Sequence, residues 1–440
     1  MGYLAPDDIL RMSSTVLCLD KTDWCNIQTV AVAKSPMYYR FMGVPMVLDE
    51  SATSDLASAV QLFAKNMCNV LELDIGNHRD DVAGNHFFSS LVSLYHGRLQ
   101  MLRIEHAIPL HFTELSNITV LEICMDSDAA RVLPSANGET LVNLRLLDVP
   151  TNFAWHHFRY NSSVRPIVFE RLVILLIEYG GKESVLSESE VQRKVIAGAS
   201  NCDQLHFPEL KKLGIGNCTP DCDLLYMNHP FPNLDLIELV GPFDKLRHCC
   251  RLKLPWVDTL TVVAEGTIPH DDIKVYNAFN HFFSGICIGE KAVLSFQDSD
   301  FNLDPGQLCL NNLTDLVMHS SDYAALCKFI SRLPSLRRLE LLLLNFNSEP
   351  LSSLFDTCIQ ECKATHQQTW AAKLVSLAIF EVNDECPIAV STYGVQLLIL
   401  HARAIRELAV PSSIELFITA FINAYQHDEP HLALIQLIAE

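Results

Sequence analysis

Two pairs of cysteines have the residue types that could bind a metal ion. Cys218 and Cys222 stand four positions apart, and so do Cys358 and Cys362. Zinc takes four ligands in a tetrahedral arrangement, so each pair would need further ligands from elsewhere. The spacing is not that of a standard zinc knuckle, and in a helix it would place Cys358 and Cys362 together on one buried face. We therefore expect neither a bound metal nor a cofactor.

Other residues that could do chemistry do not form a recognisable site. His156 and His157 are adjacent, and because neighbouring side chains point apart we expect an exposed loop there. The sequence 180–182, Gly-Gly-Lys, lacks the spacing of a phosphate-binding loop. The chain also has no Gly-x-Gly-x-x-Gly and no Gly-x-Ser-x-Gly motif. These observations predict that the protein is not an enzyme and weigh against a hydrolase on an α/β frame.

The composition indicates a folded, acidic chain. Of its 440 residues, 49% are hydrophobic and 19% are charged, which supplies ample material for a buried core. The formal net charge of −20 repels nucleic acid and anionic membranes, so we expect neither as a partner. The first residues do not resemble a signal peptide. We expect a cytoplasmic or nuclear protein whose 15 cysteines are reduced.

The strongest signal is a short apolar frame that recurs along the chain. It reads apolar, two residues, apolar, one residue, apolar, and its first copies are Val70/Leu73/Ile75 and Leu99/Leu102/Ile104. Further copies begin at Ile118, Leu144, Leu172, Leu210, Leu234, Val257, Leu313, Leu336, Leu374 and Ile405. Most successive starts are separated by a step close to the period of about 20–29 residues that is typical of leucine-rich repeats. Longer steps indicate loop insertions.

Two further segments fit the frame less well. A weaker copy surrounds Leu294 and Phe296. The set Val395/Leu398/Leu400 could be another copy. We expect short strands at both places.

The frame predicts parallel strands that share one core. Its last two apolar residues stand two positions apart, so both point to the same side of a strand and their neighbours face out. Stacked repeats would pair each strand with the next and join the inward sides into a continuous core. Between frames, residues 55–67, 324–333 and 351–365 have the apolar spacing of helices. Strands and helices should therefore alternate along the chain.

Proline placement strengthens the pattern. Pro208, Pro232, Pro255 and Pro334 each stand two residues before a frame, where proline ends a preceding helix. The recurring unit resembles the leucine-rich repeats of F-box/leucine-rich-repeat proteins over roughly residues 56–411. This resemblance implies an α/β horseshoe solenoid of about a dozen irregular strand–helix repeats.

The first 48 residues form a distinct segment. Pro6, Asp8, Ile9 and Leu10 resemble the opening of an F-box. Helices are expected around residues 21–33 and 37–41, and a strand at Val47-Leu48. The resemblance implies that Pro6, Ile9, Leu10 and Leu17 dock on a Skp-type adaptor. The same segment could instead be a cap that covers the first repeat, which every solenoid needs.

These patterns divide the chain into three parts. We expect an F-box-like helical segment or N-terminal cap over residues 1–48, a leucine-rich-repeat solenoid over 49–411 and a C-terminal helical cap over 412–440. The resemblance implies a protein-binding substrate receptor of a cullin–RING ubiquitin ligase, which recognises targets through its repeats. The alternative is a free-standing leucine-rich-repeat scaffold without a ligase link.

Outward positions of the frames are the candidate partner-binding residues, because a charged side chain between two buried ones faces solvent. The candidates are Glu72, Asp74, Arg103, Glu122, Lys211, Lys212, Asp235, Glu238, Arg337, Arg338 and Glu340. The repeat at Leu172 instead has Val173, Ile174 and Leu176 there, an apolar patch that could contact a partner or be covered by the next loop. We expect a concave face of mixed, mildly acidic charge.

Overall fold

The computed structural model contains two compact units, Met1–Asn233 and Leu234–Glu440. It describes residues 29–32, 37–41, 44–48, 69–75, 92–104, 117–123, 141–150, 167–178, 205–216, 231–242, 256–265, 287–296, 312–320, 333–343, 373–381 and 392–438, together with Ser90, Leu115, Leu246, Cys249, Leu252 and Ile330. The two predicted cysteine pairs and His156-His157 lie outside these residues, and so do the helices expected over 55–67 and 351–365. Of the helix expected over 324–333, only Ile330 and Leu333 are described, and both are buried.

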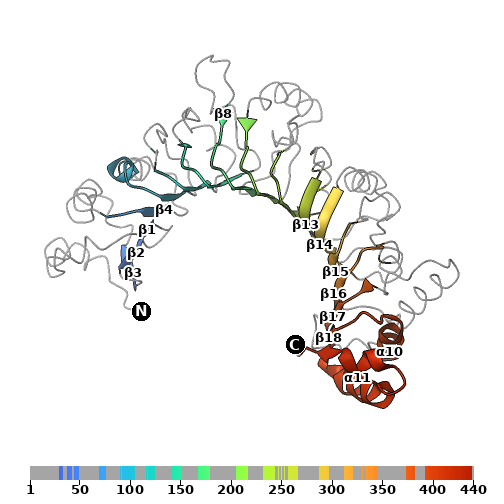
Figure 1. Cartoon of the computed structure of the whole chain (residues 1–440). Coiled ribbons are helices and arrows are strands. Elements are labelled where there is room, and N and C mark those ends of the chain that lie inside the picture. The colour runs from blue at the N-terminus through green and yellow to red at the C-terminus, as the bar shows by residue number, and fades with distance from the viewer. Residues whose placement is uncertain are drawn as a thin grey trace. The chain divides into compact units, whose positions relative to one another are not determined.

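Unit 1, Met1–Asn233, is built on a ladder of short strands (Figure 1). The order is β3 (Val44–Leu48), β2 (Met37–Phe41), β1 (Thr29–Val32), β4 (Glu72–Ile75), β5 (Met101–Ile104), β6 (Val120–Ile123), β7 (Leu146–Pro150), β9 (Ile174–Glu178) and β11 (Lys212–Gly216). The first two pairings are antiparallel, and from β1 onward they are parallel. Strands β8 (Ile167–Val168) and β10 (Leu205–His206) form a separate parallel pair.

Unit 2, Leu234–Glu440, continues the same strand type. Parallel pairing joins β12 (Leu236–Pro242), β13 (Trp256–Glu265), β14 (Cys287–Phe296), β15 (Asp315–Ser320), β16 (Arg338–Leu343), β17 (Ser376–Glu381), β18 (Glu407–Ala409) and β19 (Gln436–Leu437). Helices α10 (Thr392–His401), α11 (Ser412–Tyr425) and the 3₁₀ helix η11 (Pro430–Leu434) lie near the C-terminus (Figure 1). The segment expected as a helical cap thus contains α11, η11 and a last strand.

The inward residues of the predicted frames form the core of both units. Wherever the structure describes them, these side chains are no more than 4% exposed, and in the centre of unit 1 Leu147 is fully buried. Burying a leucine removes its apolar surface from water and stabilises the fold by about 1.5–3 kcal/mol. The prediction of repeated parallel strands with an apolar inward side is therefore confirmed.

Backbone hydrogen bonds explain why the strands repeat so regularly. The carbonyl of Thr119 accepts the amides of Arg145 and Leu146, at 2.8 and 3.0 Å. The carbonyl of Thr314 in unit 2 accepts those of Arg337 and Arg338, at 2.7 and 2.9 Å. A carbonyl oxygen has two lone pairs and can accept both donors. Each frame thus fixes where the next strand begins.

Side chains before the strands also link successive repeats of unit 1. The side-chain Nδ2 of Asn117 donates to the backbone carbonyl of Gly97 at 2.7 Å. The side-chain Nδ2 of Asn233 donates in the same way to the backbone carbonyl of Pro208, also at 2.7 Å. Both asparagines directly precede a frame, as do Asn69, Asn143 and Asn312. This recurring asparagine is a further signal in the sequence, which the apolar frame alone does not capture.

A stack of aromatic rings joins three turns of unit 1. The Phe207 ring is 5.3 Å from that of Phe169 and 5.9 Å from that of Phe231, measured between centroids. Phe169 and Phe207 are almost fully buried. Aromatic pairs at these separations contribute beyond simple burial, so this stack ties together three segments of unit 1 that are distant in sequence.

A β-bulge explains why the repeat at β14 is weak in the sequence. Val257 of β13 is opposite Ile288, whereas Thr259 is opposite Lys291, so β14 holds one extra residue between these pairs. The bulge stretches the frame, and the buried residues become Ile288, Ala292 and Leu294. The prediction of a strand around Leu294 and Phe296 is confirmed.

Three local predictions are wrong. The set Val395/Leu398/Leu400 belongs to helix α10, not to a strand, because Val395 and Leu398 are also buried at helical spacing. The helix expected over 37–41 is strand β2, and the end of the helix expected over 21–33 is strand β1. Pairing with neighbouring strands here overrides local helical preference. The strand predicted at Val47-Leu48 is confirmed as part of β3.

Candidate protein-binding face

The outward side chains of the strands form two rows that cross each ladder. Row A contains the residue directly before the middle apolar residue of each frame. Row B contains the residue between the last two apolar residues. Because neighbouring strands are in register, row members of adjacent strands stand side by side about 4.8 Å apart. These two rows contain eight of the eleven candidates predicted from the sequence.

In unit 1, row A is apolar in its middle. It runs Glu72, Met101, Val120, Leu146, Ile174 and Lys212. Met101, Val120, Leu146 and Ile174 are half-buried, so each presents part of its surface to solvent. An acid stands at one end of this apolar strip and a base at the other.

Row B of unit 1 changes from charged to apolar. It runs Asp74, Arg103, Glu122, Asp148, Leu176 and Gly214. Arg103 Nε lies 3.7 Å from Glu122 Oε2, an ion pair between adjacent strands. Leu176 lies over Gly214, where a Cβ atom would stand only 2.7 Å from Leu176 Cδ2. Glycine at this position therefore makes room for Leu176.

In unit 2, row A is polar from β13 onward. From β12 to β18 it runs Leu236, Thr259, Lys291, Asp315, Arg338, Ser376 and Glu407. Row B there runs Glu238, Thr261, Val293, Val317, Glu340, Ala378 and Ala409. The two ladders thus have the same arrangement of parallel strands but present different side chains on their outward face.

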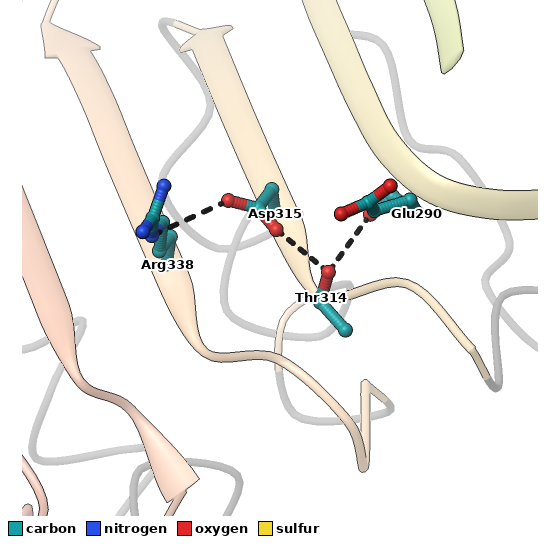
Figure 2. Close-up of polar contacts among 4 residues, drawn as sticks. All are labelled: Glu290, Thr314, Asp315 and Arg338. Carbon is teal, nitrogen blue, oxygen red and sulfur yellow. Dashed lines mark hydrogen bonds and ion pairs between the residues drawn. The ribbon is translucent and has the colours of Figure 1, made fainter. Parts of the chain in front are cut away.

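A polar cluster of unit 2 shows how these side chains are held (Figure 2). Thr314 Oγ1 donates to Asp315 Oδ2 at 2.6 Å and also approaches the carbonyl of Glu290 at 3.2 Å. Arg338 Nε lies 3.6 Å from Asp315 Oδ1. A hydroxyl has one proton to donate, so the shorter bond to the carboxylate is favoured. Asp315 is fixed between the hydroxyl of the residue before it and the guanidinium of Arg338 on the neighbouring strand β16.

The same threonine position recurs in unit 1. Thr119 Oγ1 donates to the carbonyl of Gln100 at 3.1 Å, and Thr314 Oγ1 stands at a similar distance, 3.2 Å, from the carbonyl of Glu290. The cluster of Figure 2 combines a hydroxyl, a carboxylate and a guanidinium, which together donate and accept hydrogen bonds. Its arrangement suits polar recognition. Thr314 and Glu290 were not among the predicted site residues, because their roles depend on cross-strand register.

The predicted face residues are largely where the frame places them. Glu72, Lys211, Asp235, Arg337 and Arg338 are exposed, and Arg103, Glu122, Lys212, Glu238 and Glu340 are half-buried. The backbone of Asp74 lies in β4, but its side chain is outside the described part. Of these residues, the structure pairs Arg103 with Glu122. The adaptor-docking candidates Pro6, Ile9, Leu10 and Leu17 lie outside the described residues.

The described residues include two cysteines, Cys249 and Cys287. Cys249 is buried and Cys287 half-buried, and neither of these two cysteines forms a disulfide. Within the described ranges, no three His, Cys, Asp or Glu side chains gather as ligands for a metal ion. No helix there is long and apolar enough to cross a membrane.

Comparisons with known proteins do not identify a family. No protein-family model matches the chain, and no curated protein matches its sequence.

Proposed function

We propose that this chain is a leucine-rich-repeat horseshoe that binds a protein partner through the outward rows of its strands. One observation carries the proposal. Inward positions are uniformly apolar and buried, whereas the outward positions beside them range from Leu146 and Ile174 to Asp315 and Arg338. Packing explains the inward choice, but nothing in the core requires the outward one. Exposed residues on a rigid scaffold are where proteins place recognition.

The dimensions of the rows suit a protein surface. Neighbouring strands stand about 4.8 Å apart, so the six strands from β4 to β11 in row A of unit 1 span roughly 24 Å. Protein interfaces combine an apolar centre with a polar rim. Row A has this arrangement, with Val120 and Leu146 in its middle and charges at both ends.

The test is partner capture with matched variants. The full chain is used to isolate partners from cell extract, and the double variant Leu146→Asp with Ile174→Asp is compared with the wild type by quantitative mass spectrometry. Leu416→Asp is the control, because Leu416 is 80% exposed on helix α11. The proposal expects the row A variant to lose partners that the control retains. Equal partner sets for both folded variants would contradict it.

The narrower proposal is a substrate receptor of a cullin–RING ubiquitin ligase. It rests on the resemblance of Pro6, Asp8, Ile9 and Leu10 to an F-box opening. The wild type should then retain a purified Skp-type adaptor, and the double change Ile9→Asp with Leu10→Asp should abolish this without changing the melting temperature. Failure of the wild type to retain the adaptor would remove the ligase link.

A free-standing scaffold is the second candidate, and one observation favours it. An F-box is a helical module, whereas β1, β2 and β3 form an antiparallel extension that pairs with β4. This extension covers the edge of the first repeat strand, which is what a cap does. In that case partner capture through row A persists while adaptor binding is absent.

A further inference from the structure

Trp256 is a large apolar side chain left half exposed at the start of β13. Its side chain is 51% exposed, although tryptophan is among the residues that gain most from burial. Its indole Nε1–H donates to Asp258 Oδ1 at 3.0 Å. Residues 256 and 258 point to the same outward face, since Val257 between them is fully buried. The ring is thus held in one orientation on the outward face.

The neighbouring strand β14 packs against this ring at Gly289. A Cβ atom at Gly289 would stand 2.9 Å from Trp256 Cζ2 and 2.9 Å from Asp258 Oδ1, so a larger residue would push both away. Gly289 lies in the bulge that shifts the register of β14 against β13. The indole ring therefore packs close to β14 at Gly289 through its Cζ2 atom, and 51% of the side chain remains exposed.

The surroundings of the ring are acidic. Asp235, Asp258 and Glu290 are exposed, and each directly precedes the row A residue of its strand in three consecutive strands. The amide of Thr259 bonds to the carbonyl of Asp235, which confirms that these segments are adjacent. Lys291 is the basic residue next to Glu290. These four side chains together carry a net charge of −2.

We propose that Trp256, Asp258 and Glu290 form a binding site for an arginine side chain of a protein partner. A guanidinium is planar, stacks on an indole face and donates to carboxylates around it. The exposed indole face and the acids beside it supply both contacts, and no apolar partner group would complement those acids. This inference rests on the proposed protein-binding function and names the chemistry that one part of the face recognises.

The test follows the indole signal of Trp256 directly. The full chain has four tryptophans, so ¹⁵N-tryptophan labelling gives four indole signals, and Trp256→Phe assigns the one of interest. A glycine–serine peptide containing arginine should shift that signal saturably. The same peptide with citrulline, which has the shape without the charge, should bind about tenfold more weakly, within the range expected for a cation on an aromatic ring. Added salt should weaken binding of the arginine peptide, because it screens the charges.

Four variants separate the contributions. Asp258→Asn keeps an acceptor for the indole and removes one charge, and Glu290→Gln also removes one. Each should weaken binding of the arginine peptide by about threefold, while Lys291→Gln should strengthen this binding by a similar factor. Gly289→Ala should displace the ring and reduce binding. Tyr425→Ala is the control, because it removes another half-exposed aromatic ring, 49% exposed on α11.

Two results would overturn the arginine site. One is a Trp256 signal that does not move with the arginine peptide, and the other is a signal that moves equally with citrulline. If either result were found while the Leu146→Asp, Ile174→Asp variant lost its partners, only the arginine site would be contradicted. The proposed protein-binding function would still be supported. If that variant captured its partners unchanged and Trp256 still preferred arginine to citrulline, the proposed function would be contradicted and the arginine site would be supported.

Discussion

Leu146 in unit 1 and Arg338 in unit 2 occupy the same place in their frames. Each directly precedes a buried leucine, and each amide bonds to the carbonyl of a threonine in the preceding repeat. The side chains differ completely. Leu146 lies in an apolar strip with Val120 and Ile174, whereas Arg338 forms an ion pair with Asp315. Identical backbone positions thus carry opposite surface chemistry.

This difference separates what the fold requires from what it permits. A change at an inward position must fill the space left by its neighbours, because cores are close-packed. A change at an outward position alters only the surface presented to a partner. The contrast between the units is therefore expected if each ladder presents its own binding chemistry, and the following predictions test the comparison.

The largest effect is expected at the aromatic stack, which is a feature of unit 1. Phe207→Ala should lower the free energy of unfolding by about 3–5 kcal/mol, because it removes a buried ring and its contacts with Phe169 and Phe231. Phe207→Leu keeps most of the volume and should cost less than about 1.5 kcal/mol. Urea denaturation measures both. A cost for Phe207→Ala no larger than that of Phe207→Leu would remove the stack as a stabilising element.

Adjacent leucines on opposite faces test the inward–outward contrast within one strand. Leu147→Ala should cost about 2–5 kcal/mol, because the buried side chain leaves a cavity. Leu146→Ala should cost less than about 1 kcal/mol, since the half-exposed side chain leaves no closed cavity. Leu339→Ala and Arg338→Ala make the same pair in unit 2. Similar costs for Leu146 and Leu147 would break the comparison.

The asparagine that links repeats should contribute a smaller amount. Asn117→Asp preserves the size but removes the donor to the carbonyl of Gly97. We expect a loss of about 0.5–1.5 kcal/mol in the free energy of unfolding, the range of a single hydrogen bond. Asn233→Asp should behave alike, because its 2.7 Å bond to Pro208 is the same contact. Stability unchanged in both variants would exclude this role.

The two cross-strand ion pairs should have the smallest effect. The Arg103 side chain is 40% exposed and the Arg338 side chain 70%, so solvent screens the second pair more. Double-mutant cycles for Arg103 with Glu122 and for Arg338 with Asp315 should give coupling below about 1 kcal/mol. The coupling should be larger in unit 1 and should fall with added salt. A larger coupling for Arg338 would reverse this ranking of the two units.

The apolar frame predicted most of the strands because its inward residues follow one rule. Leu102, Leu147 and Leu339 are all close to fully buried, as the period-two spacing requires. The frame was misleading at Val395 and Leu398, because buried apolar residues three apart satisfy a helix equally well. It missed the start of the repeat at β14, where the bulge adds a residue before Ala292.

The candidate site could be predicted only in part. Charged outward residues such as Arg103 and Glu122 follow directly from the frame, and the structure pairs them. Trp256 was not predicted from the sequence as a site residue. The orientation of its side chain depends on Gly289 of another strand, 33 positions further along the chain. The approach of Thr314 to the carbonyl of Glu290 likewise joins residues of two repeats. Contacts between repeats depend on register, which a single frame does not encode.

The most direct test of the central claim reads folding and partner binding in the same set of variants. Leu147→Ala and Leu339→Ala change the inward side, whereas Leu146→Asp and Arg338→Glu change the outward side. Each variant is measured by urea denaturation and by retention of partners captured with the wild type. We predict that inward variants lose stability, and that outward variants keep their fold but lose partners. Outward variants that retain every partner while remaining folded would contradict the account.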